Sequence, residues 1–247
     1  TAGTNFIGTT DNVDLVFKRN SIQSGKISAT NTSLGVYSFS SSASGNGNTA
    51  VGTGALFSAV STNDATAVGY RASYFGLGGN NTSIGANSLY ANILGTGNVS
   101  IGNNALNNMQ GDENTAIGQE AMSGGTIGSK NTAVGRNSLL NTESDNNIGI
   151  GYFSGRSNTT LGNRLFINSI SRGSLLNDTT QSIIYGAQDA IPDSQRLYLN
   201  SKIYAPYLST GIPVGAKRVL IGSDNQFYAA DTTSGGGSSG ITVGTTT

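Results

Sequence analysis

The sequence predicts an all-β solenoid built from about nine short repeats. Three observations indicate this fold: one short sequence motif recurs along the chain, its copies are almost evenly spaced, and each copy has an aliphatic residue at the same position. The clearest copies are the segments 48–56, 81–89, 114–122 and 131–139. A fixed short period of this kind is typical of a protein made of stacked repeats, in which stability comes from neighbouring copies.

One glycine marks each copy, and we call it the repeat glycine. The repeat glycines are Gly35, Gly52, Gly69, Gly85, Gly102, Gly118, Gly135, Gly151 and Gly162. Apart from the last step of 11 residues, they are 16 or 17 residues apart. A repeat of this length is too short for two helices and a loop, but it can hold two strands of about five residues and two tight corners. We therefore expect each copy to form one coil with two strands, Thr-Ala-Val and Asn-Ser-Leu.

Each position relative to the repeat glycine has its own chemistry. The preceding residue is aliphatic in all nine copies, as at Val51 and Ile117, and we expect these side chains to form the core. On this reading Ile117→Asp would bury an unpaired charge and destabilise the fold strongly. The residues two before and three after the glycine are mostly Ala or Ser. We expect these small residues to leave a face along which chains approach closely.

Asparagine and a second glycine mark the corners of the coil. Asn stands four residues before the repeat glycine in every copy but the third, which has Ala65. Asn tolerates left-handed backbone conformations, bonds nearby backbone groups and can bond its stacked copies. Glycines such as Gly95 and Gly111 stand three residues before several of these asparagines, and we expect them to supply a positive φ at the entry corner.

The chain divides by composition into four regions. Residues 1–30 form an N-terminal β segment or cap, 31–168 the repeat solenoid, 169–230 an irregular β-rich shaft or neck, and 231–247 a Gly/Ser/Thr linker. Outside the repeats, runs rich in β-forming residues predict further strands. These runs are Val13–Lys18, Ile22–Ile27, Ser182–Tyr185, Arg196–Leu199 and Arg218–Ile221.

The composition argues against several functions. Formal net charge is zero and only 11% of residues are charged, so the chain lacks the basic face that nucleic-acid binding needs. No apolar run is long enough to insert as a membrane span. The absence of histidine and cysteine excludes histidine-based acid–base catalysis and the commonest metal ligands. We expect a protein that is not an enzyme, with no catalytic residues, metal or cofactor.

The repeat motif resembles the head repeats of trimeric autotransporter adhesins, the YadA-like head. The resemblance covers residues 31–166 and is carried by Ala50-Val51-Gly52, Ser83-Ile84-Gly85 and Ala133-Val134-Gly135. It implies a left-handed parallel β-roll assembled as a homotrimer. The repeat here is longer than is usual in that family, which implies looser corners.

A second resemblance, to repeats of bacteriophage tail fibres and related virion appendages, is stronger still. It is carried by the motif Asn-Thr-Ala-Ile-Gly at 114–118 and by the segments 162–167 and 196–200. This resemblance implies a structural fibre segment on the virion. Such a segment holds or forms a host-receptor-binding region and attaches to other virion tail or capsid proteins. Fibres of this kind often end in a self-cleaving chaperone domain, which we do not recognise before Thr247.

Two other functions stay open at this point. One is the head of a bacterial trimeric adhesin that binds host or matrix at the bacterial cell surface. The other, more distant, is a secreted depolymerase, which would need facing carboxylates such as Asp11 with Asp14 or Asp112 with Glu113.

Aromatic residues supply the only candidate recognition surface. They gather where the repeat is irregular, in the third and eighth copies. Exposed aromatic rings can stack on sugar faces and suit wet interfaces, so a host surface glycan or protein receptor is the expected partner. The competing interpretation is that these rings cover apolar edges at irregular coils. The candidate residues are Tyr70, Arg71, Tyr74, Phe75, Tyr152 and Phe153.

Overall fold

The computed structural model describes residues 7–39, 45–169, 174, 179, 182–187, 196–199, 217–221 and 227–231. The chain is all-β, as predicted, and its described residues contain fifteen strands. The strands are β1 (Leu15–Arg19), β2 (Ile22–Ile27), β3 (Thr32–Leu34), β4 (Thr49–Val51), β5 (Thr66–Val68), β6 (Thr82–Ile84), β7 (Val99–Ile101), β8 (Thr115–Ile117), β9 (Thr132–Val134), β10 (Ile148–Ile150), β11 (Arg164–Ile167), β12 (Ile184–Ala187), β13 (Arg196–Leu199), β14 (Lys217–Ile221) and β15 (Phe227–Asp231).

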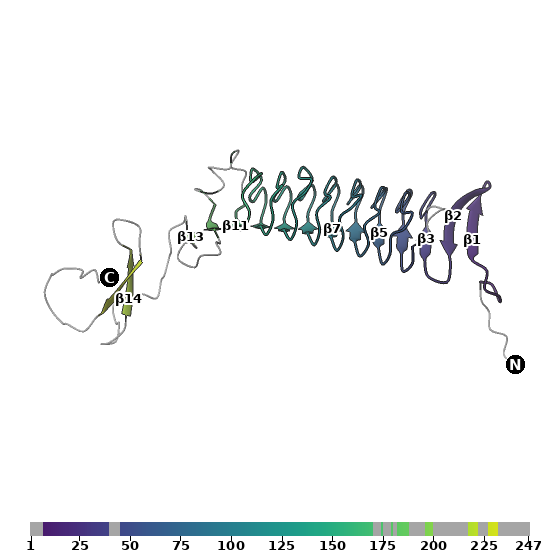
Figure 1. The fold of residues 1–247 in the computed structure, drawn as a ribbon, viewed down its shortest axis with the longest axis horizontal. Helices are drawn as coiled ribbons and strands as arrows, with labels where there is room; N and C mark the ends of the chain where they lie inside the picture. The colour runs from purple at the N-terminus through teal and green to yellow at the C-terminus, as the bar shows by residue number, and fades with distance from the viewer. Residues whose placement is uncertain are drawn as a thin grey trace. The chain divides into compact units, whose positions relative to one another are not determined.

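The strands β3 to β11 form one parallel ladder in sequence order, and each coil of the solenoid joins one strand to the next (Figure 1). Equivalent residues pair in register, for example Thr115 with Thr132. The predicted second strand of each coil is wrong. The residues two and four after the repeat glycine, such as Asn87 at φ 54° and Leu89 at φ 50°, are left-handed. Residues in that region cannot continue an extended strand.

The turns after the glycine still bond from coil to coil. Leu89 N–H donates to the Ala105 carbonyl at 3.0 Å, and Asn87 N–H donates to the Tyr70 carbonyl at 2.9 Å. Backbone hydrogen bonds therefore join neighbouring coils on the turn side as well as on the strand side.

The interior of the solenoid is filled by the opposite side chains from those predicted. Ala116 and Ala133, two residues before their repeat glycines, are fully buried, and so are Leu106 and Leu139, four after theirs. Ile117 is 39% exposed. The middle residue of a three-residue strand points to one face while its neighbours point to the other. In β3 to β10 the middle residue is Ala, Ser or Gly, small enough for a narrow coil that also holds the side chain of the turn.

The first eight repeat glycines, from Gly35 to Gly151, are required by both conformation and space. Gly118 has φ 137°, and a Cβ there would lie 2.6 Å from the carbonyl carbon and oxygen of Gly135 in the next coil. The entry-corner glycines are required by space alone. They do not have the positive φ that was predicted for them. A Cβ on Gly111 would lie 2.0 Å from the Gly128 carbonyl oxygen. The left-handed residue lies two positions later, directly before the corner asparagine, as at Glu113 with φ 58°.

The corner asparagines link the coils through their side chains. Asn114 is buried; its Nδ2 donates to the Gly128 carbonyl at 2.8 Å, and its Oδ1 accepts the Asn131 N–H at 2.9 Å. The same acceptor bond recurs with Asn98 Oδ1 and Asn131 Oδ1 in neighbouring coils. Each asparagine thus satisfies buried backbone groups of the following coil, which would otherwise cost free energy.

Antiparallel strands extend both ends of the ladder. The predicted strands near the N-terminus are confirmed: β1 and β2 form a hairpin, and β2 pairs with β3. At the other end β11 pairs with β12 and β12 with β13. The hairpin turns through Asn20 and Ser21, both with positive φ, as a two-residue hairpin loop requires.

The ninth repeat lies at a different register from the predicted one. Gly162 and the residue before it, Leu161, precede the ninth strand, which is Arg164–Ile167. Ile148 pairs with Leu165, so the 17-residue step continues. Phe166, which is fully buried, occupies the interior position that Gly149 holds in the eighth coil.

Contacts divide the chain into two units, residues 1–201 and 202–247. The second unit contains the hairpin of β14 and β15. The predicted linker at 231–247 lies outside the described residues except for Asp231, and much of the predicted shaft at 169–230 also lies outside them.

Candidate recognition surface

The six candidate residues form two separate groups. Tyr70, Arg71, Tyr74 and Phe75 belong to the coil that follows β5. Tyr152 and Phe153 belong to the coil that follows β10, five coils further along the ladder. The structure therefore does not bring the two groups together.

Three aromatic rings stack along the turn side of the ladder at one equivalent position, five residues after the repeat glycine. The Phe57 and Tyr74 ring centroids are 4.9 Å apart, and those of Tyr74 and Tyr90 are 5.4 Å apart, with both pairs inclined by 18°. These distances are close to the spacing of neighbouring strands, so equivalent rings in successive coils stack. We call Phe57, Tyr74 and Tyr90 the aromatic ladder.

Other aromatic residues pack on the edges of this ladder. Phe75 makes edge contacts with Tyr74 at 4.8 Å and with Tyr90 at 5.3 Å. Tyr37, from the first coil, contacts the edge of Phe57 at 6.1 Å. The sequence analysis missed Tyr37, Phe57 and Tyr90. For Phe57 and Tyr90 the signal was present, because they share the offset of Tyr74 from the repeat glycine.

Arg71 lies over two tyrosine rings. Its guanidinium carbon is 5.0 Å from the ring centroid of Tyr70 and 5.4 Å from that of Tyr74, within the range of cation–π attraction. Its backbone is fixed by the coil, because Arg71 N–H donates to the Thr53 carbonyl at 2.9 Å. The guanidinium thus lies beside two aromatic rings, and the N–H groups of a guanidinium suit planar anions.

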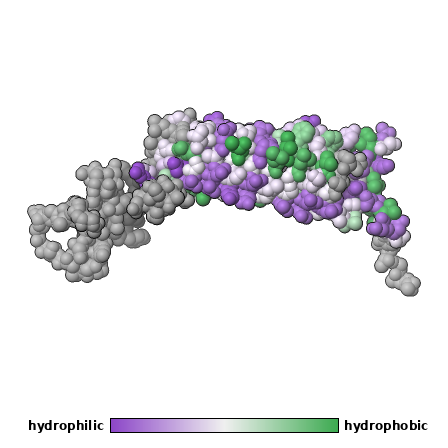
Figure 2. All heavy atoms as spheres, viewed as in Figure 1, coloured by the Kyte–Doolittle hydropathy of each residue, from purple (hydrophilic) through white to green (hydrophobic). Residues whose placement is uncertain are grey.

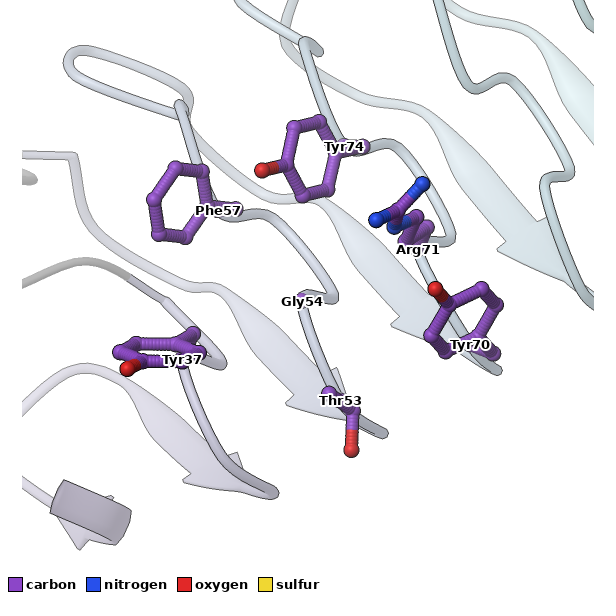
Figure 3. Close-up of a pocket in the computed structure, with 7 residues that line it drawn as sticks. All are labelled: Tyr37, Thr53, Gly54, Phe57, Tyr70, Arg71 and Tyr74. Atoms are coloured by element: carbon purple, nitrogen blue, oxygen red, sulfur yellow. The ribbon is translucent and has the colours of Figure 1, made fainter. Parts of the chain in front are cut away.

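A pocket of about 370 Å³ opens beside the aromatic ladder (Figure 3). Figure 3 shows Gly54 between Tyr37 of the preceding coil and Arg71 of the following coil. The other seven coils carry a side chain at the position of Gly54, two after the repeat glycine. A Cβ on Gly54 would lie 3.1 Å from Tyr74 Cε2. The pocket exists because this coil has glycine there. Its lining residues are Tyr37, Thr53, Gly54, Phe57, Tyr70, Arg71 and Tyr74.

The second group is smaller. The Tyr152 and Phe153 rings meet at 4.3 Å with an angle of 64°. Arg136 lies 5.9 Å from the Tyr152 ring and Arg156 lies 4.6 Å from the Phe153 ring. This arrangement repeats the pairing of arginine with aromatic rings, without the stacked ladder.

Two of the four carboxylates weighed for hydrolysis have structural partners. Asp112 Oδ1 accepts the Thr96 N–H at 2.7 Å, and Asp14 forms an ion pair with Lys26 at 3.3 Å. Asp112 therefore bridges two coils, and Asp14 joins the two strands of the N-terminal hairpin. In the described residues, no group of three or more metal-ligating side chains is placed to hold an ion.

Comparison of the chain with protein-family models, with curated proteins and with solved structures found no match. In the part of the chain that the structure describes, no helix is long and apolar enough to cross a membrane.

Proposed function

We propose that the chain is a structural segment of a phage tail fibre or a similar virion appendage, which carries a receptor-binding region. The observation that supports this most is the continuous ladder of nine parallel strands, bonded from coil to coil on both sides and at its asparagine corners. Because each coil is held by its two neighbours, such a ladder is stiff along its axis. A stiff segment suits a protein that carries a binding surface away from a particle.

We further propose that the segment works as a homotrimer, joined through the outward face of the ladder rather than through small residues. Those small residues are buried within each coil, so they are unavailable for contact between chains. The outward residue before each repeat glycine forms an aliphatic column that is wholly or partly exposed. The column is Leu34, Val51, Val68, Ile84, Ile101, Ile117, Val134 and Ile150.

A second set of exposed apolar residues competes with this column as the contact surface. Figure 2 shows that the exposed hydrophobic residues in that view gather over the N-terminal half of the ladder. The second set follows the loops and includes Val60, Leu77, Ile93 and Leu94, but the next coil places Gln110 at the position of Ile93. The strand-face column continues over eight coils without interruption, which favours it as the interface.

Light scattering on the purified chain tests the assembly. We expect a stable species with three times the chain mass of 25.1 kDa. A folded monomer at micromolar concentration would contradict the homotrimer. Labelling with antibody on intact particles and on bacterial cells tests the location, and we expect the label on the virion tail.

The alternative function is the head of a bacterial trimeric adhesin, where the solenoid itself binds host or matrix. The aromatic pocket on the solenoid favours this alternative specifically, because it places a candidate site on the ladder rather than beyond it. Label on the bacterial cell surface, and none on particles, would support the adhesin.

A further inference from the structure

We propose that the pocket above Gly54 binds an acidic sugar, a pyranose ring that carries a carboxylate, within a surface polysaccharide. The inference rests on the proposed receptor-binding function and names its ligand class. Three features of the pocket carry it: exposed aromatic residues, a cation that forms no ion pair among the described residues, and the absence of a side chain at one position only.

The aromatic rings supply the platform for a sugar ring. Phe57 and Tyr74 both line the pocket, and their rings stack on each other at 4.9 Å (Figure 3). The most exposed rings of the lining are Tyr37 and Tyr70, at 56% and 49%, and they offer the aromatic surface on which a sugar ring can stack. Tyr37 also contacts the Phe57 ring through an edge at 6.1 Å. A pocket of about 370 Å³ lies at the lower end of the size range of small-ligand sites, which suits one or two sugar rings rather than a larger ligand.

Arg71 supplies the reason for an acidic sugar. None of the residues that line the pocket is acidic, so Arg71 gives it a positive charge. Among the described residues Arg71 forms no ion pair. Its guanidinium carbon lies 5.0 Å from the Tyr70 ring centroid and 5.4 Å from that of Tyr74, and the N–H groups of a guanidinium can bind a carboxylate through two parallel hydrogen bonds.

The backbone argues against an acidic peptide. Gly54 N–H donates to the Val36 carbonyl at 2.9 Å, and Arg71 N–H donates to the Thr53 carbonyl at 2.9 Å. These backbone groups at the pocket are used between coils, so they offer no edge to which an extended peptide could add. The polar groups in the lining are instead the hydroxyls of Thr53 and of three tyrosines, which suit sugar hydroxyls.

Binding is measured by calorimetry and saturation-transfer NMR with tetragalacturonate, tetraglucuronate, tetramannuronate and a sialic acid dimer, each at millimolar concentration. The methyl ester of tetragalacturonate tests the need for charge, and tetraglutamate tests the peptide. We expect at least one acidic sugar to bind, its ester to bind at least about tenfold more weakly, and tetraglutamate not to bind. If no acidic sugar binds, or if the ester or tetraglutamate binds as well, the proposal is overturned.

Three variants locate the site. Gly54→Asn restores the side chain that Asn87, Asn104 and Asn137 place at this position with the same positive φ, so the variant should fold and fill the pocket. Arg71→Gln removes the cation. We expect each to weaken binding at least about tenfold, while Arg136→Gln, an equal loss of charge beside Tyr152, leaves binding unchanged.

Undiminished binding by Gly54→Asn or Arg71→Gln would overturn the pocket assignment. Light scattering on each variant separates this failure from that of the proposed function. A trimer that binds no acidic sugar would contradict the pocket alone, and a sugar-binding monomer would contradict the assembly alone.

Discussion

The corner amides show how single side chains hold the coils together. Replacing Asn114 by Ala removes the acceptor of the Asn131 N–H and the donor to the Gly128 carbonyl, and leaves both backbone groups buried. Each unsatisfied buried group costs roughly 1–3 kcal/mol, so we expect the free energy of unfolding to fall by at least about 2 kcal/mol. Urea denaturation checks this, with Asn103→Ala at an exposed position as the control. Equal effects in the two variants would refute it.

Asn92 is a buried asparagine that, unlike Asn114, stabilises no neighbouring coil through its amide. It is fully buried, and in the structure neither Oδ1 nor Nδ2 of its amide has a hydrogen-bond partner. The equivalent position in the next coil holds the buried Met109. We expect Asn92→Met to raise the free energy of unfolding by about 1 kcal/mol, because an unpaired polar group leaves the interior. A lower melting temperature for the variant would contradict this expectation.

Two glycines with positive φ separate conformation from space. At Gly118 the positive φ and the lack of space for a Cβ both require glycine. At Gly97, which has φ 67°, a Cβ would meet no atom closer than 3.7 Å. Other coils place Asn80 or Asn146 at the position of Gly97. We expect Gly118→Ala to cost at least about 2 kcal/mol and Gly97→Asn less than about 1 kcal/mol. Thermal unfolding of the pair decides it, and similar losses would show that space between coils is not the constraint.

At the scale of the element, the sequence predicted the period and the parallel stacking but not the direction of the side chains. In a strand of three residues, such as Thr-Ala-Ile at 115–117, the middle side chain points to one face and its two neighbours point to the other. This alternation does not by itself say which of the two faces lies inside the coil. The predicted core put Ile117 inside because the residue before the repeat glycine is aliphatic in all nine copies. In the structure the coil is too narrow for this, and the small Ala116 points inward instead. The width of the coil follows from turn conformations that the residue types do not reveal.

The ninth repeat and the recognition surface show the same limit. Asn158 and Gly162 match the repeat motif but precede the strand at 164–167. That strand continues the 17-residue step of the ladder, although Gly162 does not follow it as a repeat glycine would. The irregularity of the third copy pointed to Tyr74 and Arg71, which both line the pocket. The pocket beside them depends on the missing side chain at Gly54, two residues after an ordinary repeat glycine.

The C-terminal antiparallel strands make stability depend on alkaline pH through Tyr185 of β12. Tyr185 packs between Phe166 and Tyr198, and burial raises its pKa above the ordinary value of about 10, although the charge of Arg164 opposes the shift. The neutral phenol is therefore favoured in the fold. Its contribution is fully present below the ordinary pKa and is lost as pH rises through the higher folded pKa.

We expect Tyr185→Phe to reduce the loss of stability between about pH 9 and 11, because the variant has no proton to release there. Denaturant titrations across this range measure the slope. Tyr152→Phe, which removes a hydroxyl from an exposed ring, is the control. If wild type, Tyr185→Phe and the control share one slope, the buried phenol does not govern the alkaline loss.

At the scale of the whole molecule, the direction of one residue separates folding from assembly. Ala116 and Ile117 are neighbours on β8, and only Ala116 points into the coil. Ala116→Asp would bury an unpaired carboxylate, so we expect it to lower the free energy of unfolding by at least about 3 kcal/mol. Ile117→Asp places its charge on the outward aliphatic column, where a single chain leaves it in water.

For Ile117→Asp we therefore expect a chain that keeps its β-sheet circular dichroism but no longer forms the homotrimer in light scattering. The physical reason is that a charge in an apolar contact loses its hydration when chains associate. Thr115→Asp, also on the outward face but two residues from the column, should weaken assembly less. A trimer that tolerates Ile117→Asp would exclude the aliphatic column as the interface, and a variant that unfolds like Ala116→Asp would return Ile117 to the core.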